Sequence, residues 1–158
     1  MIEIRALTEA DRPWVTEQLT QRWGSPVMVT RGQVFDAPML RGLLACEDTT
    51  PCGLLLYHIE DGACEIVTLD SWREGQGIGT ALLNAARELA QQRGCTRLFL
   101  ITTNDNLPAQ AFYQKRGFRQ AAVYPNAMEM ARILKPEIPA IGLNGIPITD
   151  EIELEMVL

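Results

Sequence analysis

The stretch "REGQGIGTALL", residues 73–83, constrains the fold more than any other part of the chain. An apolar run with the composition of a strand, "EIVTL", lies just before it. After it, apolar residues recur at helical spacing until Gly94, a residue type that commonly ends a helix. The stretch therefore predicts a strand, a glycine-rich turn and an amphipathic helix, in that order.

The same stretch has the properties of an anion site. Gly75, Gly77 and Gly79 lack Cβ atoms, so a ligand can approach the backbone closely. The N–H groups of residues 76–80 would lie at a helix N-terminus, where the helix dipole favours negative charge. A diphosphate fits both features. The simpler alternative is that the glycines only turn the chain.

Two common phosphate motifs do not fit. A dinucleotide fingerprint read from Gly75 would need a glycine where Thr80 stands, and an acidic residue about 20 positions on, where Leu100 stands. No Gly-Lys-Ser/Thr follows the loop, which excludes a Walker-type P-loop. The anion is therefore expected to belong to another kind of ligand.

Strand and helix patterns alternate only in part along the chain, which predicts a mixed α/β or α+β sheet. We expect one domain over residues 1–158, because we find no repeat, linker or low-complexity segment. Helices are expected from Thr8 to about residue 23, after the glycine loop, over 104–117 and over 127–134. Strands are expected at 2–7, 42–48, 52–61, 63–70, 96–102, 118–124 and 148–158, with a short one near 27–30.

Charge and composition argue against several kinds of partner. The formal net charge of −6 disfavours nucleic acid and anionic membranes, and is compatible with a cationic small substrate. No apolar run reaches the roughly 18 residues of a membrane span, and the N-terminus is unlike a signal peptide. A cytoplasmic protein is expected. His58 is the only histidine and the four cysteines form no Cys-x-x-Cys pair, so we expect packed, reduced thiols and no metal site.

Two segments together resemble a known superfamily. "LDSWREGQGIGTALL" is similar to the acyl-CoA-binding signature of the GNAT superfamily of N-acyltransferases. "NDNLPAQAFYQKRGF" is similar to its second signature, Asn-x-x-Ala-x-x-x-Tyr-x-x-x-Gly-Phe. The order and separation of the two also fit. The resemblance covers roughly residues 2–125 and is specific within 64–118.

The resemblance implies a fold and an activity. The fold would be a mixed, mostly antiparallel central sheet, splayed between its fourth and fifth strands, with helices on both faces. The activity would be transfer of an acetyl group from acetyl-CoA to a primary amine by direct attack, without a metal. The acceptor would be a small molecule or a peptide, and the protein a monomer or homodimer. The alternative is a non-catalytic acyl-CoA-binding or sensing module on the same fold.

The resemblance also assigns residues to the cofactor. The backbone N–H of Leu69 would bond the acyl carbonyl, Asn106 and Ala109 would face the pantetheine arm beside Phe112, and Tyr113 would act as general acid. Without the motif, Tyr113 would be an ordinary core aromatic. The diphosphate would lie on the glycine loop, namely Arg73, Glu74, Gly75, Gln76, Gly77, Ile78, Gly79 and Thr80.

One loop residue departs from the family pattern. Glu74 stands where GNAT proteins usually have Arg or Gln. A carboxylate beside a diphosphate is unfavourable unless it points outward. We therefore expect the backbone amides to bind, with Arg73 assisting from the rim.

A catalytic base is suggested by strand pairing. A two-residue turn at Asp61-Gly62 would place His58 directly opposite Glu65, on the same face of the sheet. Glu65 is then a candidate base with His58 beside it, although it lies about 13 Å along the strand from Leu69. Asp70 is nearer but, by simple alternation, faces the opposite side. A purely structural His58–Glu65 pair is the alternative, with the amine deprotonated by solvent.

Two features near the C-terminus have open interpretations. Glu151, Glu153 and Glu155 alternate with apolar residues and so share one face, which is either a solvated strand face or an acidic wall for a cationic acceptor. The Pro/Gly-rich segment 135–147 is either a lid over the acceptor site or a rigid connector.

Overall fold

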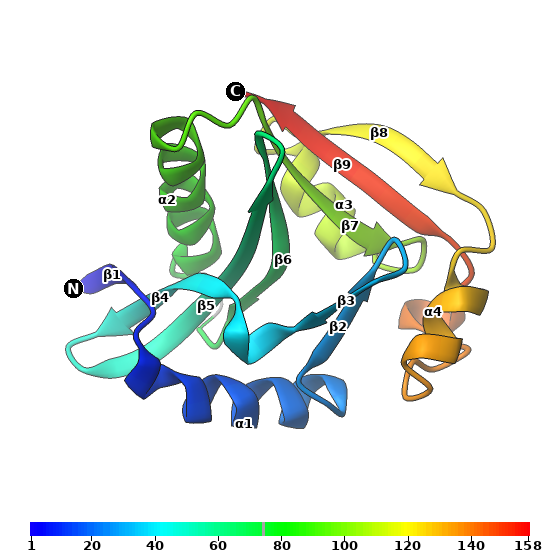
Figure 1. Cartoon of the computed structure of the whole chain (residues 1–158), viewed down its shortest axis with the longest axis horizontal. Helices are drawn as coiled ribbons and strands as arrows, with labels where there is room; N and C mark the ends of the chain where they lie inside the picture. Colours follow the sequence, from blue (N-terminus) through cyan, green and yellow to red (C-terminus); the bar gives the residue numbers. More distant parts are fainter. Residues whose placement is uncertain (74) are drawn as a thin grey trace.

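The computed structural model describes residues 1–73 and 75–158. A seven-stranded, mostly antiparallel sheet forms its centre, and a separate two-stranded hairpin lies beside it (Figure 1). Across the large sheet the strands are β1 (Ile2–Ala6), β4 (Arg41–Glu47), β5 (Thr50–Glu60), β6 (Ala63–Ser71), β7 (Arg97–Thr103), β9 (Glu151–Val157) and β8 (Arg119–Tyr124). The hairpin consists of β2 (Val27–Thr30) and β3 (Gln33–Asp36).

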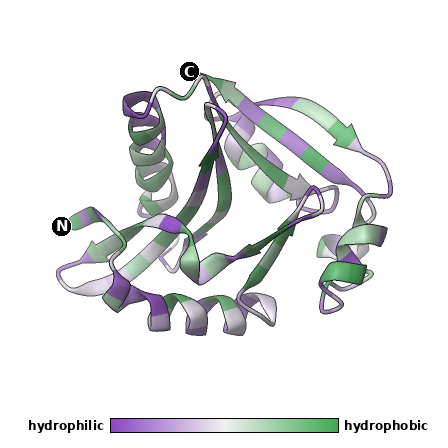
Figure 2. Cartoon of the chain, viewed as in Figure 1, coloured by the Kyte–Doolittle hydropathy of each residue, from purple (hydrophilic) through white to green (hydrophobic). Residues whose placement is uncertain are grey.

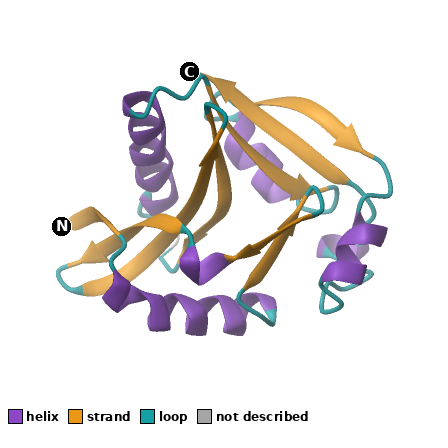
Figure 3. Cartoon of the chain, viewed as in Figure 1, coloured by secondary structure: helices purple, strands orange, loops and turns teal. Residues whose placement is uncertain are grey.

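Helices cover both faces of the sheet (Figure 3). The long amphipathic α2 (Ile78–Gln92) packs on one face, and its buried residues join the larger core cluster. The helix α1 (Arg12–Trp23) packs on the other face, over Leu44, Leu54 and Leu56. Two shorter helices complete the fold, α3 (Leu107–Gln114) and α4 (Met128–Leu134), together with the 3-10 turns η1 (Glu9–Asp11), η2 (Ala37–Met39) and η3 (Leu143–Gly145).

The expected elements are present, with two differences at their ends and one additional strand. The 3-10 turn η1 precedes α1, and the Asp11 carboxylate accepts hydrogen bonds from the backbone N–H and hydroxyl of Thr8. The strand β3 was not expected, although Arg31-Gly32, both with positive φ, forms the tight turn that leads into it. The last strand begins at Glu151 rather than at residue 148. Its alternation of polar and apolar residues is visible as colour bands on β9 in Figure 2.

The sheet is splayed where the resemblance implied. β6 and β7 are the fourth and fifth strands across the sheet, and they are parallel. They pair only from Ala63↔Arg97 to Ile66↔Leu100. Beyond these pairs the strands diverge, as Figure 1 shows, and the space between them opens.

A β-bulge in β6 changes which side chains share a face. The pairing runs from Tyr57↔Ile66 directly to Leu56↔Thr68, so that Val67 is an extra residue. Glu65 therefore pairs with His58, as expected from the Asp61-Gly62 turn.

The bulge overturns the expectation for Asp70. Thr68 pairs with Leu56, and Asp70 pairs with Leu54. These two leucines pack in the core cluster under α1, and they alternate regularly with His58 along β5. Asp70 and Glu65 therefore lie on the same face of the sheet, not on opposite faces, because one inserted residue reverses the alternation.

Candidate active site

A cavity of ≈ 670 Å³ occupies the opening between the splayed strands. Its walls come from segments far apart in sequence: the end of α1, β2, the outer halves of β6 and β7, one side of α3, the start of α4 and the segment that follows α4. Four of the residues expected around the cofactor lie on these walls, namely Leu69, Asn106, Ala109 and Tyr113.

The glycine loop forms the start of α2. Gly75 and Gly77 have φ of +75° and +71°, in the left-handed region that favours glycine. Gly77 is the N-cap, and the N–H of Ala81 donates to its carbonyl at 2.9 Å. The N–H groups of residues 78–80 precede that first helical bond, so they have no acceptor inside the helix. The first turn contains no acidic residue, which leaves the positive end of the helix dipole uncompensated there.

Side chains around the loop fix its position. The side chain of Ile78 is buried in the core, so only its backbone can serve a ligand. Gly79 lies against Phe112, and a Cβ added there would be 3.3 Å from the ring. The assignment of Glu74 lies outside the described residues. The guanidinium of Arg73 forms an ion pair with Glu47 of β4, and its assistance to a diphosphate stays a prediction.

Arg116 is a residue of this region that the sequence analysis did not select. Its Nε donates to the hydroxyl of Thr80 at 2.9 Å, and its Nη1 donates to the carbonyl of Phe112 at 2.8 Å. Its guanidinium also lies 3.7 Å from the centre of the Phe112 ring. Arg116 thus ties the end of α3 to the first turn of α2. The only sequence signal was its place inside the second motif.

The α3 helix brings its motif residues to the cavity. Asn106 caps the helix, and its side-chain oxygen accepts a hydrogen bond from the N–H of Ala109 at 3.2 Å. Tyr113 lies one helical turn after Ala109. Its ring packs between those of Phe112 and Phe118, at centroid distances of 5.2 and 5.3 Å.

The Tyr113 hydroxyl has the properties of a proton donor. The side chain is buried and lines the cavity. Among the described residues, its hydroxyl makes no hydrogen bond. Burial, with a further contribution from the negative charge of Asp70, raises the pKa of Tyr113 above its ordinary value. The phenol is therefore protonated at neutral pH, and no hydrogen bond to a described residue holds its proton back from the cavity.

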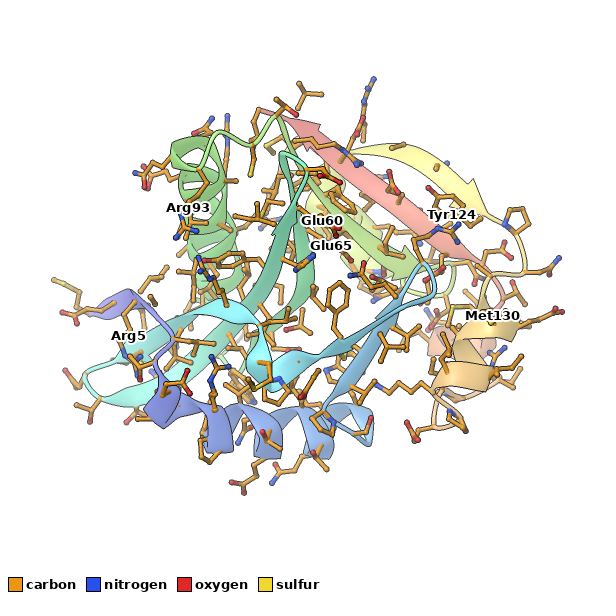
Figure 4. The ribbon with its side chains drawn as sticks, viewed as in Figure 1. Arg5, Glu60, Glu65, Arg93, Tyr124 and Met130 are labelled. Atoms are coloured by element: carbon orange, nitrogen blue, oxygen red, sulfur yellow. The ribbon has the colours of Figure 1, made fainter. Side chains whose placement is uncertain are left out.

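Glu65 is held beside the β2–β3 hairpin. Its carboxylate accepts a hydrogen bond from the hydroxyl of Thr30 at 2.7 Å. Figure 4 labels Glu65 just below Glu60, near the middle of the view. Burial raises the pKa of Glu65, against the hydrogen bond from Thr30 and the charge of His58, which lower it. The ring of His58 turns to Glu60, with 3.2 Å between Nε2 and Oε2. Thr30 lines the cavity, and Glu65 lies directly behind it.

Asp70 is a second buried carboxyl group on this face. Its Oδ1 accepts a hydrogen bond from Arg22 of α1 at 3.0 Å. Its Oδ2 and the hydroxyl of Thr68 are buried and have no partner among residues 1–73 and 75–158. Burial raises the pKa of Asp70, against the charge of Arg22, which lowers it. Alternation alone had hidden this group, because the bulge at Val67 is not visible in the sequence.

The three glutamates of β9 are neither a solvated face nor a free acidic wall. Glu151 is buried and pairs with Arg31, and Tyr124 donates its hydroxyl to Glu153 at 3.0 Å. Glu153 and Glu155 both pair with Arg97. Their charges are therefore largely compensated within the protein.

The Pro/Gly-rich segment forms a fixed wall of the cavity. Asp105, at the end of β7, accepts hydrogen bonds from the Thr103 hydroxyl at 2.5 Å and from the N–H of Leu143 at 3.0 Å. A Cβ on Gly142 would be 2.0 Å from the Asp105 carboxylate, so only glycine allows this approach. The segment is therefore attached to the rim rather than free of it.

Two further observations concern metals and membranes. Within the described residues, no three His, Cys, Asp or Glu side chains are grouped so as to hold a metal ion. All four cysteines are buried and unpaired, as expected. None of the helices in residues 1–73 and 75–158 has the length and apolar character needed to cross a membrane.

Comparisons with known proteins agree with this geometry. The sequence profile of the Acetyltransferase (GNAT) family matches residues 5–118. The chain is 46% identical to the uncharacterized protein YdhI of Bacillus subtilis (strain 168) over 151 residues, covering 95% of this chain and 94% of the relative.

Two solved structures share the fold. An IAA acetyltransferase from Bacillus cereus superposes with a TM-score of 0.73 at 21% identity, over the whole of both chains. A GNAT family acetyltransferase from Elizabethkingia anophelis with acetyl-CoA bound gives a TM-score of 0.72 at 23% identity, covering 99% of this chain and 98% of the other.

Proposed function

The chain belongs to the GNAT family of acetyltransferases, and on that premise we propose that it transfers the acetyl group of acetyl-CoA to a primary amine. The observation that carries the proposal is that the buried Tyr113 lines one cavity together with the motif residues Asn106 and Ala109. We divide this cavity into a cofactor half and an acceptor half. One half begins at the motif residues of α3. The other half is lined by Met28, Val29 and Thr30 of β2 and by the segment after α4.

The cofactor half suits acetyl-CoA. The free N–H groups at the start of α2 would bind the diphosphate, and Asn106 and Ala109 would face the pantetheine arm. The structural relative from Elizabethkingia anophelis holds acetyl-CoA, which supports the same ligand here.

The transfer itself needs three groups around the thioester. The N–H of Leu69 would donate to the carbonyl oxygen, where negative charge develops as the amine attacks. A carbon–nitrogen bond forms and the carbon–sulfur bond breaks, so that the sulfur leaves as a thiolate. Tyr113 would donate its proton to that sulfur, because its phenol is protonated at neutral pH and lines the cavity.

The amine must be neutral to attack, so a base is needed. We assign this role to Glu65, with His58 as the neighbour that tunes it. Asp70 is the second candidate, because the bulge places it on the same face and one of its oxygens is unpartnered. Burial raises the pKa of each carboxyl group, which makes it a better base than an exposed one.

An assay of free-thiol release with acetyl-CoA and a panel of amines tests the proposal. Amine-dependent release of CoA, with an acetylated amine found by mass spectrometry, is the expected result. Binding of acetyl-CoA without turnover on any amine would instead favour a non-catalytic acyl-CoA sensor. The absence of both binding and turnover would reject either function.

A further inference from the structure

Lys135 is a buried lysine on the acceptor half of the cavity. It caps the C-terminus of α4, where its N–H donates to the carbonyl of Ala131 at 2.8 Å. Only 6% of the residue is exposed, and it contributes to the cavity wall. The chain contains one other lysine, Lys115, which is exposed after α3.

The ammonium group of Lys135 has no anionic partner in the described protein. Its one polar contact is the thioether sulfur of Met28, 4.0 Å from Nζ. Glu137 is the acid whose charge acts on it, but Glu137 is exposed and no ion pair joins them. Burial lowers the pKa of Lys135, the direction expected for a cation without a close carboxylate.

Three other charged residues lie on the cavity wall, namely Arg22, Asp105 and Glu137. Arg22 pairs with Asp70, and Asp105 accepts two hydrogen bonds that fix the rim. Glu137 is exposed and accepts a hydrogen bond from the Ser25 hydroxyl at 3.5 Å. Lys135 is therefore the cation on this wall that has no ion pair with a described residue. An unpaired buried ammonium is unfavourable, and an anion that enters the site stabilises it.

We infer that Lys135 recognises an anionic group on the acceptor, so that the substrate is an amine that also carries a carboxylate or a phosphate. The inference rests on the proposed function. The anion would lie at Lys135 and the amine would extend toward the opening between β6 and β7. Met28, Met128, Ile138 and Ile148 line the wall between them, which fits an apolar spacer.

The net charge of the chain does not by itself favour a cationic acceptor. An acidic protein is compatible with a cationic acceptor, but the β9 glutamates are paired with arginines, while the cation at Lys135 is not paired. The local charge of the cavity, rather than the total charge of the chain, decides which acceptor fits.

The first test compares matched amines in the wild type, Lys135→Met, Lys135→Arg and the control Lys115→Met. The pairs are β-alanine with ethylamine, and glucosamine 6-phosphate with glucosamine, so that a carboxylate and a phosphate are examined separately. We expect the wild type to favour the anionic member of at least one pair by about tenfold or more in kcat/KM. This preference should be lost in Lys135→Met, kept in part in Lys135→Arg and unchanged in Lys115→Met.

Two results separate the inference from the proposed function. Turnover of amines with no preference for the anionic member, or with a preference that Lys135→Met retains, would overturn the inference and leave the function standing. No turnover and no binding of acetyl-CoA would reject the function.

A second measurement tests whether an anion binds at Lys135, and it does not depend on turnover. Thermal unfolding is compared in potassium chloride, potassium phosphate and potassium acetate at equal ionic strength. Phosphate or acetate should raise the Tm of the wild type and of Lys115→Met above its value in chloride, and should do so less in Lys135→Met. Equal anion shifts in all three proteins would overturn the site.

Discussion

The two halves of the cavity are built in different ways. The cofactor half and the neighbouring start of α2 rely on backbone groups and short-range contacts, namely the turn into α2 and the cap of α3 by Asn106. The acceptor half consists of side chains that come from α1, β2, β6 and the segment after α4. A backbone site can bind the same ligand in many proteins, whereas a side-chain site can change its ligand without changing the fold. We therefore expect substitutions in the first half to affect binding of acetyl-CoA, and substitutions in the second half to affect the choice of amine.

The largest effect is expected at Gly77. A Cβ there meets nothing within 4 Å, and Asp and Asn both tolerate positive φ better than most residues. Gly77→Asp should raise the Kd of acetyl-CoA by about 100-fold or more, equivalent to about 3 kcal/mol, because it adds a carboxylate beside the diphosphate. Gly77→Asn, which has the same shape without the charge, is the control and should bind far more tightly. If calorimetry finds the same Kd of acetyl-CoA for both variants, the diphosphate does not bind at this loop.

The next effect is expected at Tyr113, where the two halves meet. Tyr113→Phe should lower kcat by about 100-fold, within the usual range for loss of a general acid, and should leave the KM for acetyl-CoA nearly unchanged. The fold should not suffer, since the hydroxyl makes no hydrogen bond to the described residues. If the variant has the kcat of the wild type, Tyr113 is not the general acid and its role is packing.

A smaller effect, and a shift with pH, is expected for the base. The wild-type kcat/KM should rise with pH as the base loses its proton, and burial places that limb above the ordinary range for a carboxyl group. Glu65→Gln should remove the limb and lower the rate at neutral pH by about tenfold or more. His58→Gln should move the limb to higher pH, because the charge of His58 lowers the pKa of Glu65.

The variant Asp70→Asn completes this pH–rate series. If it removes the limb and Glu65→Gln does not, the base is Asp70. A limb that persists in all three variants would leave deprotonation of the amine to solvent.

The smallest effect is expected at Arg116, which only supports the loop. Arg116→Gln loses the hydrogen bond to Thr80 and should raise the Kd of acetyl-CoA by about fivefold, equivalent to about 1 kcal/mol. The matched control is Arg87→Gln, which changes an exposed arginine on α2, the helix that carries Thr80. This variant should bind acetyl-CoA as the wild type does. An Arg116→Gln variant that binds as tightly as the wild type would show that the loop is positioned by its backbone alone.

The same contrast explains what the sequence could predict. The strand, loop and helix around Gly77 are local, so spacing alone gave them, and the Asp61-Gly62 turn correctly placed His58 opposite Glu65. The bulge at Val67 depends on pairing with β5 and has no local signal, which is why the face of Asp70 was predicted wrongly. The burial of Lys135 could not be predicted from the sequence, because it depends on contacts with β2 and with the wall of the cavity.

A crystal structure of the acetyl-CoA complex tests the account most directly. The account predicts that the diphosphate oxygens accept hydrogen bonds from N–H groups of residues 76–80, and that the thioester lies between β6 and β7, with its sulfur within reach of the Tyr113 hydroxyl. Acetyl-CoA bound with its diphosphate away from the start of α2, or with its acetyl group outside the opening between these strands, would contradict it.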